Sequence, residues 1–153
     1  MRGAYCIDGK KTGVAAAATM CYITAAASKP VIVTSAYLTF PGSNVTNQQL
    51  EAEWAKITSL GSPTATSQTP SPFEPNDQAA AMTAAVFVTG SEPTYSTTLV
   101  WGHQGFSSLA GWFYNPLPEE RLWIGAGLSY GIRLLGTVTS TDIAVCVNVI
   151  ECG

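Results

Sequence analysis

Charged residues are scarce in this sequence. Only 11% of its 153 residues are Asp, Glu, Lys or Arg, less than half of the share of about 25% that is usual in globular proteins. The net charge is −3, and the seven Lys and Arg residues are scattered along the chain. Because no basic stripe is present to neutralise phosphates, we do not expect nucleic acid as a partner. A charge-poor surface is typical of a protein that other subunits partly cover. The alternative is a monomer whose solubility depends on Ser, Thr, Asn and Gln side chains.

Hydrophobic runs long enough to cross a bilayer are also missing, so we expect no membrane partner. Near the N-terminus, Lys10 and Lys11 precede an Ala-rich run that ends in small residues at 25–28, which superficially resembles a secretory signal. Asp8 stands before that run, and Thr19 and two further polar residues dilute it. We therefore expect this region to be part of the mature fold, an arm followed by a strand.

Metal-binding and redox motifs are absent. The four cysteines (Cys6, Cys21, Cys146 and Cys152) lie near the two chain ends, no pair has Cys-x-x-Cys spacing, and there is a single histidine. These residues do not form a zinc or redox motif, so we expect no metal and no cofactor. If the first and last strands are neighbours, Cys6–Cys152 and Cys21–Cys146 disulfides are open alternatives, as are free thiols.

Catalytic motifs are missing as well. His103 lies in the glycine-flanked segment 101–105, which we interpret as a polar turn, and no nucleophile elbow accompanies it. Acidic pairs occur at Glu51/Glu53 and Glu119/Glu120, and oxygen ligands occur at 74–77, but without glycosidase context or calcium-loop spacing. We interpret all of these acids as solvated surface groups and do not expect an enzyme. Residues 44–46 match the N-glycosylation pattern.

What the chain does contain is a series of strand patterns. Residues 142–150 place Ile143, Val145, Val147 and Val149 on one face with period two. Residues 48–58 fit a helix or a strand, and we favour a strand with two outward glutamates. The proline-rich segment 61–77 is expected to be a long loop. Further strands are expected over 16–25, 30–40, 79–89, 94–101, 112–114, 122–125 and 128–135.

These patterns predict an all-β protein with a single domain. We expect a jelly-roll β-sandwich of about eight antiparallel strands over residues 12–153, preceded by an N-terminal arm over residues 1–11.

Aromatic residues are concentrated between Trp101 and Trp123. Some are expected in the core, but the consecutive residues Trp112, Phe113 and Tyr114 cannot all point to the same side of a strand. At least one must face outward, which suits a subunit interface or a sugar-binding platform. We take Trp112 and Tyr114 as candidate partner contacts.

The segment 121–134, with its glycine-rich turn leading into Gly131-Ile132-Arg133-Leu134 and then a closing strand, resembles small jelly-roll proteins of tailed-phage virions. These are capsid decoration (cement) proteins, whose fold is similar to that of trimeric tumour-necrosis-factor-like domains. The resemblance implies a non-enzymatic bacteriophage protein on the capsid surface that stabilises the phage head. It also implies a homotrimer whose arm reaches a neighbouring subunit or the major capsid protein.

The arm supplies the other candidate contacts. Tyr5 and Ile7 would dock as apolar groups, and Arg2, Lys10 and Lys11 would pair with an acidic shell; the alternative is that the segment pairs as an edge strand of its own sheet. Two other functions stay open: a carbohydrate-binding jelly-roll module using outward aromatics, and a trimeric ligand of the tumour-necrosis-factor or complement type.

Overall fold

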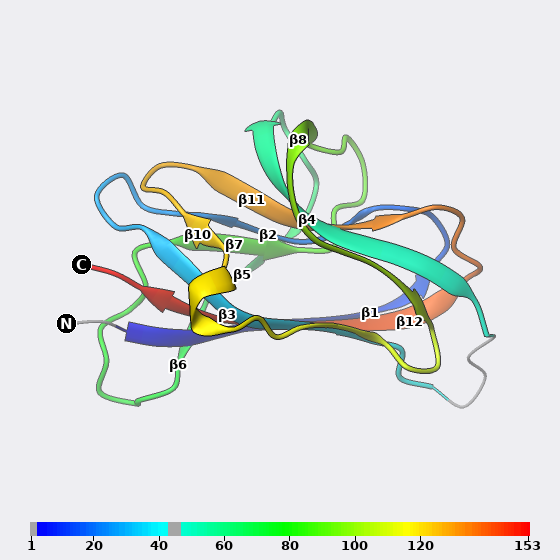
Figure 1. Cartoon of the computed structure of the whole chain (residues 1–153), viewed down its shortest axis with the longest axis horizontal. Helices are drawn as coiled ribbons and strands as arrows, with labels where there is room; N and C mark the ends of the chain where they lie inside the picture. Colours follow the sequence, from blue (N-terminus) through cyan, green and yellow to red (C-terminus); the bar gives the residue numbers. More distant parts are fainter. Residues whose placement is uncertain (1–2, 43–46) are drawn as a thin grey trace.

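The computed structural model describes residues 3–42 and 47–153 and is built from two antiparallel sheets that pack face to face (Figure 1). Within the described residues 12 strands and one 3₁₀ turn (η1, Pro118–Glu120) occur, and no α-helix is present. The prediction of an all-β protein is confirmed. The glycosylation pattern at 44–46 and the candidate contact Arg2 lie outside the described residues.

The first sheet has the strand order β10-β3-β12-β1-β6, with β9 also paired to β3. Its strands are β1 (Gly3–Val14), β3 (Val31–Thr39), β6 (Ser71–Pro72), β9 (Trp112–Tyr114), β10 (Trp123–Ile124) and β12 (Thr141–Glu151). The three long strands β3, β12 and β1 form its centre.

The second sheet has the strand order β5-β7-β2-β11-β4-β8. Its strands are β2 (Thr19–Thr24), β4 (Gln49–Ser59), β5 (Thr66–Gln68), β7 (Thr83–Val86), β8 (Thr94–Ser107) and β11 (Ser129–Leu135). The strand interpretation of residues 48–58 is therefore confirmed, because tertiary pairing with β8 and β11 decides between the two periodicities.

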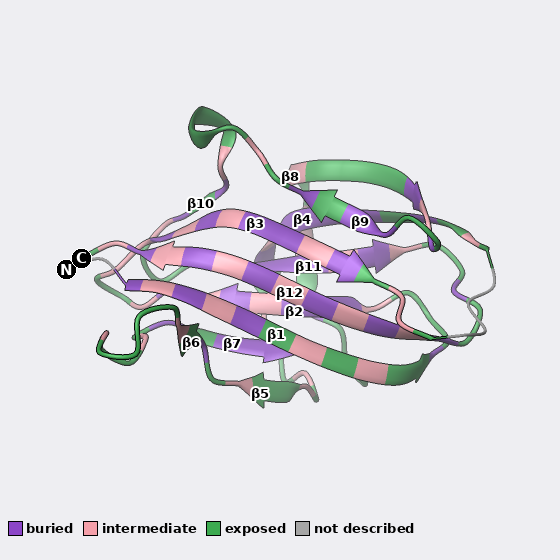
Figure 2. Ribbon diagram, turned by 90° about the horizontal axis from the view of Figure 1, so that it is seen from below, coloured by how far each residue is buried: buried purple, intermediate pink, exposed green. Residues whose placement is uncertain are grey.

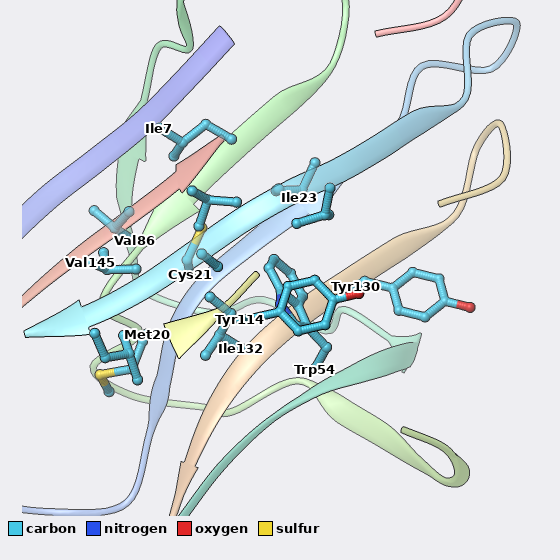
Figure 3. Packing of buried hydrophobic residues seen from close by; sticks show 14 of the residues in the cluster. Ile7, Met20, Cys21, Ile23, Trp54, Val86, Tyr114, Tyr130, Ile132 and Val145 are labelled. Atoms are coloured by element: carbon cyan, nitrogen blue, oxygen red, sulfur yellow. The ribbon is translucent and has the colours of Figure 1, made fainter. Parts of the chain in front are cut away.

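One hydrophobic core fills the space between the sheets (Figure 3). Alternate residues of β12 are buried and face it, as the period-two pattern predicts. Ile7 and Val145 from the first sheet pack in the same cluster as Ile23 and Ile132 from the second. The ring of Tyr114 lies edge-on to that of Trp54, with ring centroids 6.5 Å apart, and so joins the two sheets.

The N-terminal segment is a strand of the domain and not a separate arm. β1 pairs with β12 from Gly3↔Glu151 to Val14↔Thr141, with one bulge near its end. Its alternation puts Tyr5 and Ile7 into the core, where they are 3% and 0% exposed. The apolar residues that suggested docking on a partner instead stabilise this chain's own sheet, because a paired strand also satisfies its backbone hydrogen bonds.

Two other local predictions need correction. The proline-rich segment is not wholly irregular, since it contributes β5 and β6, and Pro72 is tolerated because β6 lies at the sheet edge. Residues 101–105 are not a turn but lie within β8. There Gly102 adopts a positive φ of 61°, and the register between β4 and β8 shifts at this point.

Candidate assembly surface

The outer face of the first sheet carries two large exposed aromatic side chains, Phe113 and Trp123. Figure 2 looks onto this face, where β3, β12 and β1 alternate buried residues with less buried ones. The buried set faces the core, so the other set points away from it. The strand register arranges these outward residues in rows across the sheet.

The first row is wholly apolar. It runs from Trp123 on β10 through Ile32 on β3 and Ile150 on β12 to Ala4 on β1, each residue directly opposite the next. Trp123 is 56% exposed, although a tryptophan side chain gains strongly from burial. This end of the face therefore presents a continuous apolar strip to the surroundings.

The second apolar row contains Phe113, Tyr37 and Cys146 and ends at Asp8. Phe113 is 52% exposed, and its ring meets that of Tyr37 edge-on with a centroid separation of 5.7 Å. A shallow groove of about 410 Å³ lies beside this row, lined by Asp8, Gly9, Lys10, Tyr37, Thr39, Phe113, Ala144, Val145 and Cys146. The groove is mostly apolar in its lining and open to solvent.

Among the described strand residues, the charged side chains on this face lie in one part of β1 and β12. Lys10 Nζ on β1 lies 3.8 Å from Asp142 Oδ2 on β12, and Asp8 lies two positions before Lys10 on β1. Both members of the ion pair are partly exposed, so the pair contributes little to stability. The outer face thus presents two apolar rows, which are separated by a more polar row of Cys6, Asn148 and Ser35, and a charged margin at one end.

The structure places the predicted contacts as follows. Trp112 and Tyr114 point into the core, 0% and 8% exposed, and Tyr5 and Ile7 are buried as described above. Lys10 is exposed, and Lys11 is half-buried at the end of β1. The outward member of the aromatic run is Phe113. The alternation of side chains in a strand predicted that at least one of the three aromatic residues faces outward, but it did not predict which one. That choice depends on how β9 pairs with β3.

A polar cluster on the outer face of the second sheet was missed by sequence reasoning. Glu53 was expected to be solvated but is 3% exposed. Its Oε1 accepts hydrogen bonds from Nε of Arg133 (2.6 Å) and from the Arg133 Nη2 group, and its Oε2 accepts one from Nδ1 of His103 (2.6 Å). Glu51 lies 3.6 Å from Nε2 of the same imidazole. The cluster joins β4, β8 and β11.

Local geometry explains how these groups meet. Arg133 and Glu53 are directly opposite each other on β11 and β4. The irregular register beside Gly102, whose φ of 61° suits glycine, turns His103 onto the same face. Burial raises the pKa of the Glu53 carboxyl, but hydrogen bonds and charge from His103 and Arg133 outweigh it and hold that pKa below its usual value.

The polar network continues across the sheet to Tyr95. The Arg133 guanidinium lies 5.2 Å from the centre of the Tyr95 ring, and the Tyr95 hydroxyl is 2.6 Å from that of Thr19. The Thr19 hydroxyl in turn donates to Glu92 Oε2 at 2.5 Å. Every polar group in this chain of contacts is engaged by another, which is the arrangement of a structural network that ties strands together.

Within residues 3–42 and 47–153, no group of three or more His, Cys, Asp or Glu side chains is placed to hold a metal ion. The same residues contain no helix with the length and apolar character needed to span a membrane.

No protein-family model matches the chain, and no curated protein matches it significantly.

Proposed function

We propose that this protein is a non-enzymatic structural subunit of a virion, a capsid decoration protein that binds the assembled phage head and stabilises it as a homotrimer. The observation that carries the proposal is the pair of apolar rows on the outer face of the first sheet, in which Phe113 and Trp123 are both more than half exposed. Exposed apolar side chains grouped in this way are typical of protein–protein contacts.

The connectivity supports the jelly-roll part of this proposal. β12 inserts between β1 and β3, and β11 inserts between β2 and β4. Late strands that return to lie beside early ones are the mark of Greek-key connections, from which jelly rolls are built. The capsid decoration proteins that the sequence resembles have a jelly-roll fold similar to that of trimeric tumour-necrosis-factor-like domains, and that resemblance is the reason for choosing a trimer.

The charge distribution supports burial of this face against further copies of the chain. A stable contact buries about 800 Å² per partner with a core depleted of charge, and the rows ending in Phe113 and Trp123 provide such a core. The charged margin of Asp8, Lys10 and Asp142 would lie at the rim, where charges are commonly found.

The first experiment measures oligomeric state by light scattering coupled to size-exclusion chromatography. The wild-type protein should be trimeric at micromolar concentration, and the double variant Phe113→Ser/Trp123→Ser should be monomeric with an unchanged circular dichroism spectrum. Leu99→Ser is the matched control, because Leu99 is 40% exposed but lies on β8 of the other sheet. A monomeric wild type, or a double variant that stays trimeric, would overturn the proposed interface.

The second experiment tests the virion role. Virus particles purified from the source that encodes this chain are analysed by mass spectrometry, and recombinant protein is tested for co-sedimentation with them. The protein should be present in many copies per particle. Its absence from the particles, together with a failure to co-sediment, would refute the decoration function.

Sugar binding is the main competing function, and the geometry gives it less support. The aromatic residues expected to form a platform, Trp112 and Tyr114, are buried in the core. A platform would have to use Phe113 or Trp123 instead. Binding on a glycan array that Phe113→Ser abolishes would favour the carbohydrate-binding function over the assembly function.

A further inference from the structure

Two of the four cysteines lie in contact on neighbouring strands of the first sheet. The sulfur atoms of Cys6 and Cys146 are 3.5 Å apart, although 140 positions separate the two residues in the sequence. The register pairs Cys6 with Asn148 and Asp8 with Cys146, so the two cysteines are diagonal neighbours on β1 and β12. Both are half-buried on the outer side of the sheet.

The other cysteines are not placed to compete for this pair. Cys21 is fully buried in the core from β2 of the opposite sheet. Cys152 follows β12 and lies four residues beyond the position opposite Cys6, a distance of about 13 Å along the strand. The pairings Cys6–Cys152 and Cys21–Cys146, which the sequence left open, therefore do not fit this structure.

We propose that Cys6 and Cys146 are a thiol pair that forms an intramolecular disulfide when the protein meets a disulfide oxidant such as oxidised glutathione. One protein thiolate attacks a sulfur of the oxidant and releases one glutathione, leaving a mixed disulfide. The second protein thiolate then attacks the protein-bound sulfur and releases the second glutathione. Two electrons pass from the protein to the oxidant, and the two thiol protons end on the two glutathione molecules.

Geometry favours ring closure over a persistent mixed disulfide. The two sulfurs need to approach by only about 1.5 Å to reach bonding distance, since a disulfide bond is about 2.0 Å long. Both strands are held in register by the backbone ladder on each side of the pair, which keeps the second thiol next to the first.

The surroundings predict slow oxidation at neutral pH. Burial, the neighbouring Cys146 and the charge of Asp8 together raise the pKa of the Cys6 thiol to about 12, so little thiolate is present. In a reducing cytosol the pair stays in the dithiol form, and oxidation follows exposure to an oxidising environment. The resulting bond would clamp β1 to β12, which come from opposite ends of the chain.

The test incubates the folded full-length protein with oxidised glutathione at pH 8, quenches with an alkylating agent, and maps unreduced tryptic peptides. Cleavage after Arg2, Lys10 and Arg133 places Cys6 in peptide 3–10 and Cys146 in peptide 134–153, which also contains Cys152. The expected product is these two peptides linked, with the intact mass lowered by two hydrogens. The Cys152→Ala variant must give the same link, and Cys146→Ala must abolish it.

The same oxidation is carried out on Phe113→Ser/Trp123→Ser, so that shielding by a second copy of the chain is distinguished from a lack of reactivity. The disulfide itself does not depend on the proposed virion function. Oxidation should raise the melting temperature by on the order of 5–10 °C in wild type and in Cys152→Ala, and not in Cys6→Ala. Three results would each overturn the proposal. They are a disulfide link to Cys152 or Cys21, stable glutathione adducts on both Cys6 and Cys146, and four free thiols in Phe113→Ser/Trp123→Ser after oxidation.

Discussion

At the scale of single residues, Glu53 shows how much the environment of a side chain decides. The same residue type at Glu51, two positions earlier, is 59% exposed at its side chain, whereas that of Glu53 is 5% exposed. Burial of a carboxylate is costly unless it is paired and hydrogen-bonded, and here Arg133 and His103 supply both conditions. Glu53 is therefore a stabilising group of the second sheet.

Replacing Glu53 by Gln should destabilise the fold by about 1–3 kcal/mol, because Arg133 and His103 lose their charged acceptor. The loss is smaller than for a fully buried pair, since both partners retain access to water. Urea unfolding measures the difference. Glu51→Gln is the control and should change stability by less than about 0.5 kcal/mol; equal effects of the two variants would contradict the role given to Glu53.

The same carboxylate predicts a dependence of stability on pH. The pKa of Glu53 in the folded protein lies below the ordinary value of 4.5. Its contribution is therefore fully present above pH 4.5 and is lost as the pH falls through the lower, folded-state pKa. The unfolding free energy of wild type should decline in this window more steeply than that of Glu53→Gln, and parallel curves would argue against it.

At Gly131 there is no room for a side chain, because Tyr95 lies too close. A Cβ atom at this position would lie 2.6 Å from the Tyr95 hydroxyl oxygen. Gly131→Ala should therefore displace Tyr95 from Thr19 and Arg133 and cost about 1–3 kcal/mol in stability. Thermal unfolding of this variant is compared with that of Gly127→Ala. At Gly127 a Cβ atom would contact no neighbour, but the backbone has a positive φ of 71° that is strained for alanine. The comparison therefore separates the effect of steric crowding from that of backbone strain. Restoration of stability by a second change, Tyr95→Phe, would show that the hydroxyl is the cause.

At the scale of elements, β1 is the decisive strand. Its sequence starts the chain and contains charged residues, which suggested an arm, but its alternating residues fill the core and its backbone completes the centre of the first sheet. The strand thus belongs to the folded domain, and its contribution is hydrophobic burial combined with a long ladder of hydrogen bonds.

Deletion of residues 2–11 should consequently abolish folding, not merely weaken association. Ile7→Ala, a milder change, should cost about 2–4 kcal/mol because Ile7 is completely buried. Lys11→Ala is the control on the same strand and should be nearly neutral. Circular dichroism and thermal melts report the outcome; a truncated chain that keeps the wild-type spectrum and melting temperature would restore the arm hypothesis.

At the scale of the whole molecule, the low charge content and the apolar face have one combined consequence. Association through the rows that end in Phe113 and Trp123 would be driven by burial of apolar surface. Such association should resist salt, since the Debye length shrinks to about 3 Å at 1 M and weakens only charge–charge contacts. Light scattering in 50 mM and in 1 M NaCl should therefore give the same oligomer, whereas dissociation at high salt would point to an interface dominated by Lys10, Asp142 and other charges.

The sequence by itself determined the fold class and the position of most strands. Residues 142–150 alternate strictly and became β12, and the segments 30–40 and 128–135 became β3 and β11 within one or two residues at each end. These predictions succeed because a strand with one buried face imposes period two on its own residues, whatever its partners are.

Only the tertiary structure decided which side chains share a site. Glu53 is buried and hydrogen-bonded because Arg133 lies opposite it on β11 and because a register shift brings His103 on β8 next to it. Cys6 and Cys146 are in contact because the first strand pairs with the last. Likewise, Phe113 faces outward and Trp112 faces the core because the pairing of β9 with β3 decides which residues of β9 point to each side of the sheet. Pairing between strands distant in sequence leaves no local periodicity, so neighbours of this kind become known only when the sheets have formed.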